Sequence, residues 1–298
     1  MPRATKVWFI TGTSKGFGHI WARAALERGD RVAATARNTD TLTDLVDEYG
    51  ENALPIALDV TDVAAVEDAV KRTHDHFDRI DVDVNNAGYG LFGAIEEVTE
   101  AQARAQIETN LFGALWVTKA ALPYLREQGS GHIIQVSSIG GVNAFPTIGM
   151  YHASKWGLEG FSQSLAAEVR DFGIHVTIVE PTGYATDWRG PSAVQATHLP
   201  AYDGVRARLT ESVAARRAKP GDPEATGAAI LELVDAREPP LRIFFGSGTL
   251  DMIRAEYARR IETWEEWDEL ARRAHGNSVA ATPQGSNEQA RGAAAGSS

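Results

Sequence analysis

Short apolar runs recur along the chain, and segments long enough to form helices separate them. Each run is apolar at successive positions, a pattern typical of β-strands that are covered on both faces. Seven strands are therefore predicted, at Val7–Thr11, Arg31–Ala36, Ala53–Leu58, Ile80–Asn85, His132–Ser137, Ile174–Val179 and Leu241–Phe245.

The segments between these strands carry apolar residues at helical spacing, which predicts helices over Gly18–Gly29, Val63–Phe77, Ala101–Leu125 and Tyr151–Phe172. Regular alternation of strands and helices favours an α/β fold: a doubly wound, Rossmann-type sheet of seven parallel strands with helices on both faces. Ligands of such sheets bind where the strands end, at their carboxyl edge.

Three segments depart from this rhythm, although we expect one domain over residues 1–275. Residues 187–220 follow the sixth strand with no strand of their own, so we interpret them as a loop and helix insertion that forms a substrate lid. Residues 250–273 predict one or two charged amphipathic helices. Residues 276–298 are rich in Ala, Gly, Ser and Gln and predict a disordered tail.

Composition narrows the function classes. The net charge of -11 argues against a surface that follows nucleic-acid phosphates. The chain contains no cysteine, which excludes disulfides, thiolate nucleophiles and cysteine-ligated metals. No apolar run approaches the ~20 residues of a membrane span. We expect a soluble, cytoplasmic protein without a metal site.

A glycine-rich segment follows the first predicted strand and opens the first helix. Glycines permit positive φ and a close approach of the backbone to a pyrophosphate, and the helix N-terminus presents free N–H groups. A purely structural turn is the alternative. The segment predicts a dinucleotide-binding loop formed by Gly12, Thr13, Ser14, Lys15, Gly16, Phe17 and Gly18.

Tyr151 and Lys155 are four residues apart in a predicted helix, so both side chains lie on one face, one turn apart. A phenol with a pKa near ~10 is a poor acid or base at neutral pH. A fixed cation beside the phenol lowers that pKa and makes the group usable for proton transfer with a carbonyl or alcohol oxygen.

The glycine spacing Gly-x-x-x-Gly-x-Gly, preceded by Thr11, resembles the short, single-domain branch of the short-chain dehydrogenase/reductase family. Further motifs follow in that family's order over roughly 6–245. They are the Asn85-Asn86-Ala87-Gly88 segment, Asn110, Ser138 at a strand end, and the Tyr151 and Lys155 pair. Pro181-Thr182-Gly183 resembles the family's Pro-Gly motif with one extra threonine.

The resemblance implies hydride transfer between a nicotinamide cofactor and a carbonyl carbon, with a role for each of four residues. Tyr151 would be the general acid or base. Lys155 would lower the Tyr151 pKa and bind the nicotinamide ribose. Ser138 would stabilise the carbonyl oxygen, and Asn110 would support a proton relay through a water. Further cofactor-binding residues implied are Asp59, Val60, Asn86, Ala87, Gly88, Pro181, Gly183 and Thr186.

The choice between NADP(H) and NAD(H) depends on the end of the second strand. An acidic residue there would bind the adenosine ribose hydroxyls and repel a 2′-phosphate. This strand ends at Ala36 and is followed by Arg37, and Lys15 lies in the glycine loop. Two cations and no acid predict NADP(H), since a guanidinium grips a phosphate through two hydrogen bonds. For Asp59, a helix-capping role competes with an adenine contact.

The sequence indicates the substrate class less specifically than the cofactor. Candidate pocket residues are mostly apolar, which predicts a neutral, moderately hydrophobic ketone or secondary alcohol; they are Tyr89, Gly90, Val142, Asn143, Phe145, Tyr184 and Trp188. An enoyl reductase, a sugar epimerase and a non-catalytic NADP(H) sensor are the alternatives. Members of the family that the chain resembles commonly form homodimers or homotetramers through two long helices, here Ala101–Leu125 and Tyr151–Phe172.

Overall fold

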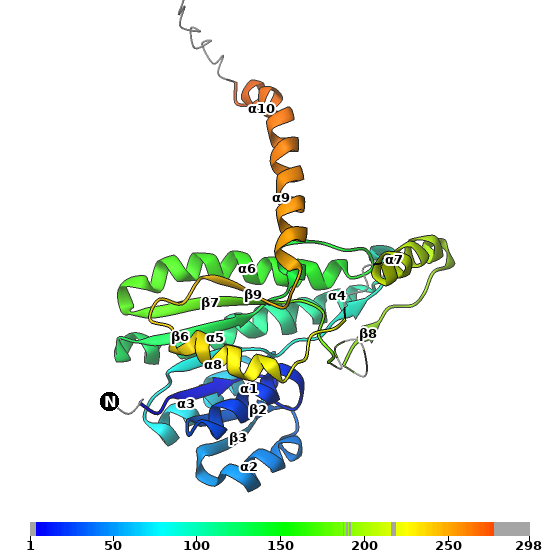
Figure 1. The fold of residues 1–298 in the computed structure, drawn as a ribbon. Helices are drawn as coiled ribbons and strands as arrows, with labels where there is room; N and C mark the ends of the chain where they lie inside the picture. Colours follow the sequence, from blue (N-terminus) through cyan, green and yellow to red (C-terminus); the bar gives the residue numbers. More distant parts are fainter. Residues whose placement is uncertain (1–3, 187, 189, 191, 216–218, 277–298) are drawn as a thin grey trace, which may run out of the picture. The chain divides into compact units, whose positions relative to one another are not determined.

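Seven apolar segments form the central sheet of the computed structural model, which describes residues 4–186, 188, 190, 192–215 and 219–276 (Figure 1). The strand order is β3-β2-β1-β4-β6-β7-β9, and every pairing is parallel. This confirms the predicted sheet. The strands are β1 (Val7–Ile10), β2 (Arg31–Ala36), β3 (Ala53–Ala57), β4 (Val82–Asn85), β6 (Gly131–Val136), β7 (Ile174–Pro181) and β9 (Arg242–Phe245).

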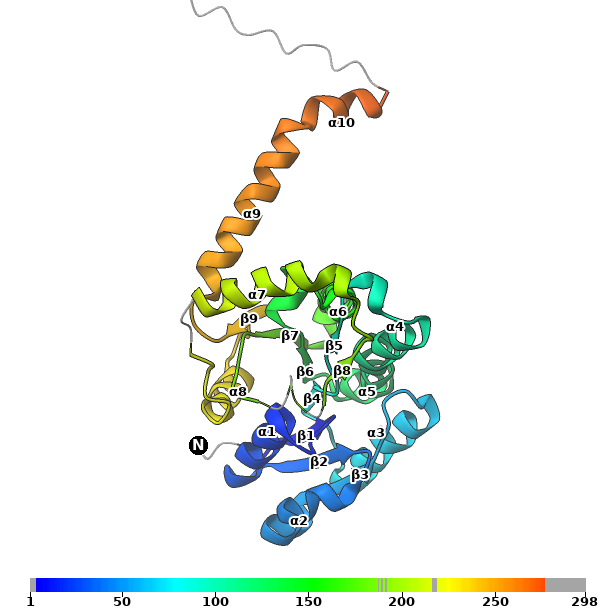
Figure 2. The same cartoon turned by 90° about the vertical axis from the view of Figure 1, so that its right-hand side faces the viewer.

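Helices connect the strands and cover the sheet on both sides (Figures 1 and 2). They are α1 (Gly16–Glu27), α2 (Thr43–Tyr49), α3 (Val63–Phe77), α4 (Glu100–Ile107), α5 (Ala114–Gln128), α6 (Gly149–Val169), α7 (Asp203–Ala215) and α8 (Ala225–Asp235). The predicted helices at the positions of α1, α3 and α6 are confirmed. The apolar pattern did not predict α2 and α8.

The predicted helix Ala101–Leu125 is wrong as a single α-helix. Its residues belong to α4, a π-helical segment η4 (Glu108–Gly113) and α5. A π-helical turn adds a residue to the hydrogen-bonded ring and re-aims the side chains that it carries, and such turns are frequent at functional sites. Asn110 lies in this segment.

The two faces of the sheet bury separate apolar cores because side chains alternate along each strand. Trp8 and Ile10 of β1 pack on the side covered by α1 and α8. Phe9, between them, packs on the opposite side with residues of α3, α5 and α6. Fully burying side chains of this size stabilises a fold by ~1.5–3 kcal/mol each, so the sheet is a rigid platform for the loops at its edges.

The segment after β7 differs from the prediction of a lid with no strand of its own. Val194–Gln195 forms a short strand, β8, that pairs in parallel with β5 (Leu91–Phe92). A 3-10 turn, η8 (Pro200–Tyr202), and α7 follow it. A two-residue strand has too little sequence for an apolar pattern, and only its distant partner reveals it.

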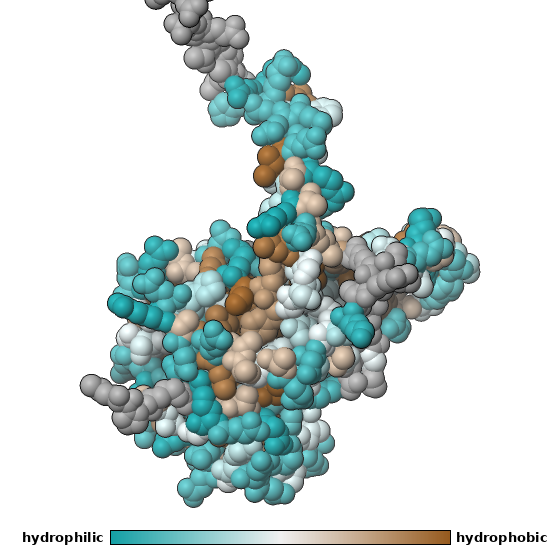
Figure 3. Space-filling view, in the orientation of Figure 1, coloured by the Kyte–Doolittle hydropathy of each residue, from teal (hydrophilic) through white to brown (hydrophobic). Residues whose placement is uncertain are grey.

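The chain divides into two compact units between Ile253 and Arg254. The first unit holds the sheet, and its surface in Figure 3 is largely hydrophilic, with apolar side chains gathered over α8 and β9. Two helices occupy the region of the predicted C-terminal helices, α9 (Thr249–Glu266) and α10 (Asp268–Ala274). The predicted tail lies outside the described residues from 277 onward. Within the described ranges, no helix has the length and apolarity that crossing a bilayer requires.

Candidate active site

The loop between β1 and α1 is held open by its glycines and by the neighbouring β4 loop. Gly12 and Gly16 have φ values of +70° and +62°, which a side chain would disfavour. A Cβ on Gly12 would approach the Ala87 Cα to 2.9 Å, whereas a Cβ on Gly16 would meet nothing within 4 Å. The loop is therefore packed against β4 at Gly12 and open at Gly16.

Thr11 and Asn86 fasten these two loops together. The Thr11 hydroxyl accepts hydrogen bonds from the backbone N–H groups of Asn86 and Ala87, at 2.9 and 3.0 Å. The Asn86 amide donates to the carbonyl oxygens of Thr11 and Gly12 at 2.9 and 3.0 Å. Asn86 and Ala87 thus position the glycine loop, which is a structural role beside the cofactor contact implied for them.

Helix α1 begins at Gly16 with no side-chain hydrogen bond from its N-cap, Lys15. Its first N–H groups and the positive end of its dipole are therefore available to an anion. Ser14 and Lys15 are exposed, whereas Thr13 is buried and donates from its hydroxyl to the Thr35 carbonyl oxygen at 3.0 Å. Phe17 packs on Tyr184, with ring centroids 5.0 Å apart. These contacts suit a loop that cradles a pyrophosphate.

The end of β2 carries a cation and no acid, as predicted. Arg37 is exposed there, as is Lys15 in the glycine loop. Asp59 accepts hydrogen bonds from the backbone N–H and the hydroxyl of Thr61 at 3.0 and 2.8 Å. Asp59 therefore closes a turn and does not cap α3, whose N-cap is Asp62, and its adenine contact stays a prediction. Val60 packs against Gly113.

Asn110 reaches from η4 to the loop after β4. Its Oδ1 accepts from the Tyr89 N–H at 3.0 Å, and its Nδ2 donates to the Tyr89 carbonyl oxygen at 3.0 Å and to Ser154 at 3.2 Å. A Cβ on Gly88 would lie 3.1 Å from Asn110 Oδ1 and 3.7 Å from Lys155 Nζ. Asn110 and Lys155 therefore lie beside the same glycine. The side-chain amide of Asn110 uses both its oxygen and its nitrogen in hydrogen bonds to the Tyr89 backbone.

Tyr151 and Lys155 lie on the inner face of α6, and both are buried. Lys155 Nζ donates to the Val136 carbonyl oxygen at 2.7 Å and lies 5.9 Å from the centre of the Tyr151 ring. Burial lowers the pKa of Lys155 to about 8, and the Glu159 carboxylate opposes that shift. Burial raises the pKa of Tyr151 to about 12, and the Ser138 hydroxyl opposes it. The structure therefore brings Ser138, Tyr151 and Lys155 together.

Lys155 was expected to lower the pKa of Tyr151, but the pKa of Tyr151 is raised in this structure. Removal of the phenol from water disfavours the charged phenolate, and here that penalty outweighs the help from neighbouring groups. The Lys155 ammonium is directed to the Val136 carbonyl rather than to the phenol oxygen. The role of Lys155 in tuning Tyr151 stays a prediction.

His152 is a positioning residue that the sequence did not reveal. Its Nε2 accepts from the Phe145 N–H at 2.8 Å, so the neutral ring donates from Nδ1 to the Gly140 carbonyl oxygen at 2.8 Å. Burial lowers the His152 pKa, which keeps the ring neutral. The Ser138 hydroxyl accepts from the Gly140 N–H at 3.0 Å. His152 thereby fixes the turn that carries Ser138.

The predicted substrate residues divide into two groups. Trp188 lies against the Tyr151 ring, with centroids 5.1 Å apart, and a Cβ on Gly90 would reach its ring at 2.9 Å. Trp188 also packs on Phe92, at 5.0 Å. Gly90 and Trp188 therefore adjoin the phenol. The others contact neighbouring loops: Tyr89 binds Asn110, Asn143 accepts from the Ala144 N–H, Val142 is buried, Phe145 packs on His152, and Tyr184 packs on Phe17.

The end of β7 leads from the cofactor loop into the insertion. Pro181 is the last residue of β7, and the N–H of Thr182 donates to the Phe245 carbonyl oxygen at 2.9 Å. Gly183 is exposed, with nothing within 4 Å of an added Cβ. The Thr186 N–H donates to the Tyr184 carbonyl oxygen at 2.9 Å, which closes a tight turn. The extra threonine is therefore accommodated by a backbone bond to β9.

Glu97 ties the insertion to the segment after β5. Its buried carboxylate accepts from the backbone N–H groups of Ala94 and Leu199, both at 2.7 Å, and pairs with Arg206 of α7. These bonds hold the pKa of Glu97 down to about 2. The Ala196 N–H adds a bond to the Phe92 carbonyl oxygen at 2.8 Å. The insertion is thereby fixed to the same segment that carries Gly90 and Phe92.

Replacement of Glu97 by glutamine is expected to loosen the insertion, because an amide cannot accept from Arg206 and both N–H groups as a carboxylate does. We expect the KM for the organic substrate to rise about tenfold while the Kd for cofactor stays unchanged. Trypsin should cleave faster within 199–212. Glu100→Gln, which removes an exposed carboxylate paired with Arg104 on α4, is the matched control. Equal KM and cleavage rates in both variants would contradict the anchoring role.

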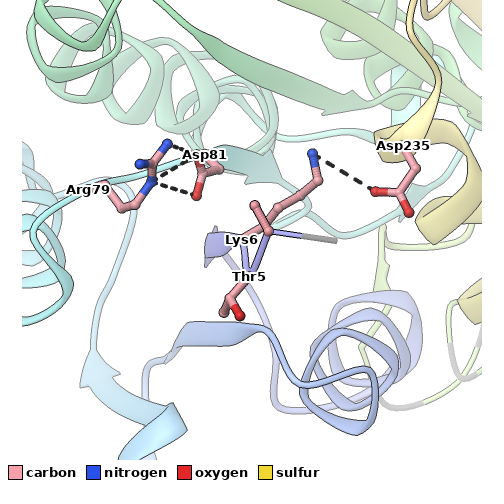
Figure 4. Close-up of a pocket in the computed structure, with 6 residues that line it drawn as sticks. Thr5, Lys6, Arg79, Asp81 and Asp235 are labelled. Carbon is pink, nitrogen blue, oxygen red and sulfur yellow. Dashed lines mark hydrogen bonds and ion pairs between the residues drawn. The ribbon is translucent and has the colours of Figure 1, made fainter. Parts of the chain in front are cut away.

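A separate pocket of ≈ 390 Å³ lies at the opposite, amino-terminal edge of the sheet (Figure 4). Its charged groups are already paired: Arg79 with Asp81, and Lys6 with Asp235 at 3.9 Å. Asp81 also accepts from the Val7 N–H at 2.8 Å. These pairs fasten the start of β1, so the carboxyl edge remains the candidate active site.

Known proteins resemble this chain in sequence and in fold. A family model for short chain dehydrogenases matches residues 6–196. Oxidoreductase BOA17 of Botryotinia fuckeliana is 42% identical over 271 residues, 90% of this chain and 98% of that protein. The crystal structure of a short-chain dehydrogenase from Streptomyces avermitilis has a TM-score of 0.83 and 38% identity, covering 92% of this chain and 100% of that one.

A third comparison concerns an archaeal enzyme crystallised with a nucleotide. The alcohol dehydrogenase from Thermococcus sibiricus, complexed with 5-hydroxy-NADP, has a TM-score of 0.67 and 27% identity, covering 83% of this chain and 98% of that one. The family match spans the glycine loop and the residues gathered at the carboxyl edge. The chain therefore belongs to the short-chain dehydrogenase/reductase family of oxidoreductases.

Proposed function

We propose that the protein is an NADP(H)-dependent oxidoreductase that interconverts a ketone and a secondary alcohol. One observation carries this proposal: a phenol, an amine and a hydroxyl, from Tyr151, Lys155 and Ser138, meet at the carboxyl edge of the sheet. They lie there beside the loop that follows Gly88. These are the groups that a carbonyl needs for orientation and proton transfer.

The bound nicotinamide cofactor supplies the hydride. Tyr151 donates its hydroxyl proton to the carbonyl oxygen in reduction and takes it back in oxidation. The Ser138 hydroxyl donates a hydrogen bond to the same oxygen and stabilises the charge that develops there. With its pKa raised to about 12, Tyr151 carries its proton throughout the neutral range, so it is ready to act as the acid in ketone reduction.

Water is kept away from this chemistry by the aromatic side chains around Tyr151. The Trp188 ring lies against it, and the insertion that carries Trp188 is anchored through Glu97. Exclusion of water strengthens the electrostatic interactions inside a site. Lys155, when charged, favours a phenolate at Tyr151 and offers donors to ribose hydroxyls.

The residues present fit an NADP(H) cofactor. The open side of Gly16 and the uncapped start of α1 suit the pyrophosphate, as the glycine geometry indicates. The exposed Arg37 and Lys15 suit a 2′-phosphate. An NADP analogue in the related Thermococcus sibiricus enzyme supports this assignment. Asp59, Val60, Asn86, Ala87, Gly88, Pro181, Gly183 and Thr186 complete the proposed cofactor site.

Arg37→Ala is expected to raise the KM for NADPH by about 10- to 100-fold, because one charge-assisted contact to phosphate contributes ~1.5–3 kcal/mol. The KM for NADH should not change, since NADH lacks the 2′-phosphate. Arg31→Ala removes an exposed arginine from the other end of the same strand and serves as the control. Steady-state kinetics with both cofactors give the answer. Loss of NADH activity in parallel with NADPH activity would refute the phosphate contact.

The proposed substrate is a neutral, moderately hydrophobic ketone or secondary alcohol. Gly90, Phe92 and Trp188 supply apolar surface beside Tyr151. A panel of ketones, followed by the loss of NADPH absorbance, tests this proposal. We expect neutral aromatic or medium-chain ketones to give higher kcat/KM than small carboxylated ketones. The reverse order would overturn the substrate class, and NADPH binding without turnover of any ketone would favour a sensor.

We further propose that the protein acts as a homodimer or homotetramer through α5 and α6. Trp156 on α6 is 39% exposed, an unusual position for a large aromatic side chain on a helix surface. Phe112 and Trp116 stack on each other at the start of α5 with centroids 6.0 Å apart. Both features support an interface along these two helices.

A further inference from the structure

Two carboxyl groups are buried behind the catalytic lysine. Glu159 follows Lys155 by one helical turn on α6 and is 5% exposed. Glu180 stands near the end of β7, just before Pro181, and is 1% exposed. Side chains alternate along β7, and Val176 packs on the α6 side of the sheet, so Glu180 faces α6 as well.

The guanidinium group of Arg242 faces this pair. Arg242 Nε, on β9, lies 2.9 Å from Glu159 Oε2 and 3.7 Å from Glu180 Oε1. The Nη2 atom of Arg242 donates to Gln163 Oε1 at 2.8 Å. Two buried carboxylates with one arginine cannot both keep a charge at low cost, because like charges repel each other strongly away from water. The shorter contact favours the charge on Glu159 and the proton on Glu180.

Burial and the nearby Glu159 carboxylate raise the pKa of Glu180 to about 8, with Arg242 opposing the shift. Glu180 therefore holds its proton at neutral pH. Oε1 of Glu159 and Oε1 of Glu180 have no hydrogen-bond partner among the described residues, and neither do the Ser137 and Ser162 hydroxyls. Both carboxyl groups therefore keep an oxygen atom that no other described residue engages by a hydrogen bond.

Glu159 lies close to the turn that follows Ser138. A Cβ on Gly141 would lie 2.4 Å from Ser137 Oγ and 3.0 Å from Glu159 Oε1. Glu159 therefore lies against the turn that Ser138 begins and Gly141 ends. Since Glu159 is four residues after Lys155 on one helix, its charge acts on the Lys155 ammonium across one helical turn.

Few other charged groups act on Lys155 besides Glu159. In the described part of the chain, the titratable or charged groups that act on Lys155 or on the pair come from α6 (Tyr151 and Glu159), β7 (Glu180) and β9 (Arg242). The π-helical segment η4 and the end of β6 present Asn110, Ser137 and Ser138, which are neutral. The electrostatic effect of neighbouring groups on the protonation of Lys155 therefore comes mainly from this carboxyl pair.

We propose that the proton of this carboxyl pair resides on Glu180 and that Glu159 is a positioning residue for catalysis, because its negative charge keeps Lys155 in the ammonium form. This inference rests on the proposed function, in which Lys155 acts as a cation beside Tyr151. The burial of Lys155 opposes its charge, and Glu159 compensates. The pair thereby sets the upper end of the pH range in which Lys155 assists Tyr151.

The test follows Lys155 directly. The full chain is labelled with [13C]lysine, and the Cε signal of Lys155 is assigned as the one that disappears in Lys155→Met. We expect Glu159→Gln to move the titration midpoint of this signal toward acid by about one pH unit, since a carboxylate one turn away favours the ammonium. Glu159→Asp keeps the charge and should restore most of the midpoint.

Two further variants complete the design. Glu168→Gln removes an exposed carboxylate from the same helix, and it should leave the Lys155 midpoint unchanged. Glu180→Gln keeps the shape of a neutral carboxyl and should place the midpoint between those of the wild type and Glu159→Gln. This variant also provides the test if Glu159→Gln does not fold. An unchanged Lys155 midpoint in both Glu159→Gln and Glu180→Gln would overturn the proposal.

The same variants separate this inference from the proposed function. In a ketone-reduction assay, Glu159→Gln should move the alkaline limb of the kcat profile toward acid, with little change in the KM for NADPH. A shifted Lys155 midpoint with no turnover of any ketone by the wild type would sustain the role of Glu159 and refute the oxidoreductase assignment. Turnover of a ketone with an unshifted Lys155 midpoint would sustain the oxidoreductase assignment and refute the role of Glu159.

Discussion

Replacing Tyr151 with phenylalanine is expected to lower kcat for ketone reduction by about 10²- to 10⁴-fold, the usual contribution of a positioned general acid. The variant removes only the hydroxyl, so the ring still packs on Trp188, 5.1 Å away between centroids. Because Tyr151 keeps its proton in the neutral range and the pKa of Lys155 is about 8, the wild type should show a flat kcat for reduction between pH 6 and pH 7.

The Kd for NADPH should stay within about threefold in Tyr151→Phe, since the phosphates are held by the glycine loop and α1. Fluorescence titration of NADPH measures this value independently of turnover. Tyr49→Phe, which removes a hydroxyl that donates to Glu48 on the surface, is the matched control and should keep full activity. A Tyr151→Phe variant with near-normal kcat would rule out Tyr151 as the proton donor.

Asp83→Val is expected to stabilise the fold at neutral and alkaline pH by a few kcal/mol. Asp83 is 0% exposed in the middle of β4, where its register partners on β1 and β6 are Phe9 and Ile133. Its Oδ1 has no partner in the described structure, and Oδ2 accepts only from Asn85 at 3.3 Å. An ionised carboxyl at such a position is costly, and a β-branched apolar residue suits it.

The sign of the pH dependence follows from the Asp83 pKa, which burial raises from 3.8 to about 7 in the folded protein. Below pH ~4 both folded and unfolded chains bind the proton, so Asp83 then carries no electrostatic penalty. As the pH rises through that value to about 7, the unfolded chain releases the proton first and the folded state loses stability. Above about 7 the loss is complete and constant.

Urea unfolding at pH 5 and pH 8 measures this effect for the wild type, Asp83→Val and Asp83→Asn. The asparagine variant keeps the size and polarity of the side chain but cannot ionise. The wild type should lose more stability between these two pH values than either variant, by an amount on the order of 2 kcal/mol. Equal losses in all three proteins would show that folding does not raise the pKa of Asp83.

The sequence predicted the sheet well because its strands are buried on both faces and therefore apolar at successive positions. The loop at Gly12 and the placing of Tyr151 and Lys155 on one helix face were also predictable, since both depend on local spacing. Asp83 shows the limit of this reasoning. Its position was predicted as strand, yet its burial between Phe9 and Ile133 follows from pairing with two distant segments.

Contacts between distant residues explain what the sequence did not reveal. Strand β8 exists only because Val194 and Ala196 bond to Gly90 and Phe92, about a hundred residues earlier in the chain. The partner of Glu97 is 109 residues away at Arg206. Glu159 and Glu180 looked like ordinary charged positions, and only the packing of α6 on β7 makes them a buried pair.

The most direct measurement of the central claim is the fate of the transferred hydrogen. NADPH carrying deuterium at C4 is incubated with the protein and a neutral ketone, and the alcohol is analysed by mass spectrometry. The account predicts one deuterium on the carbinol carbon with the wild type and about 100-fold less product with Tyr151→Phe. Tight NADPH binding with no deuterium delivered to any carbonyl compound would contradict it.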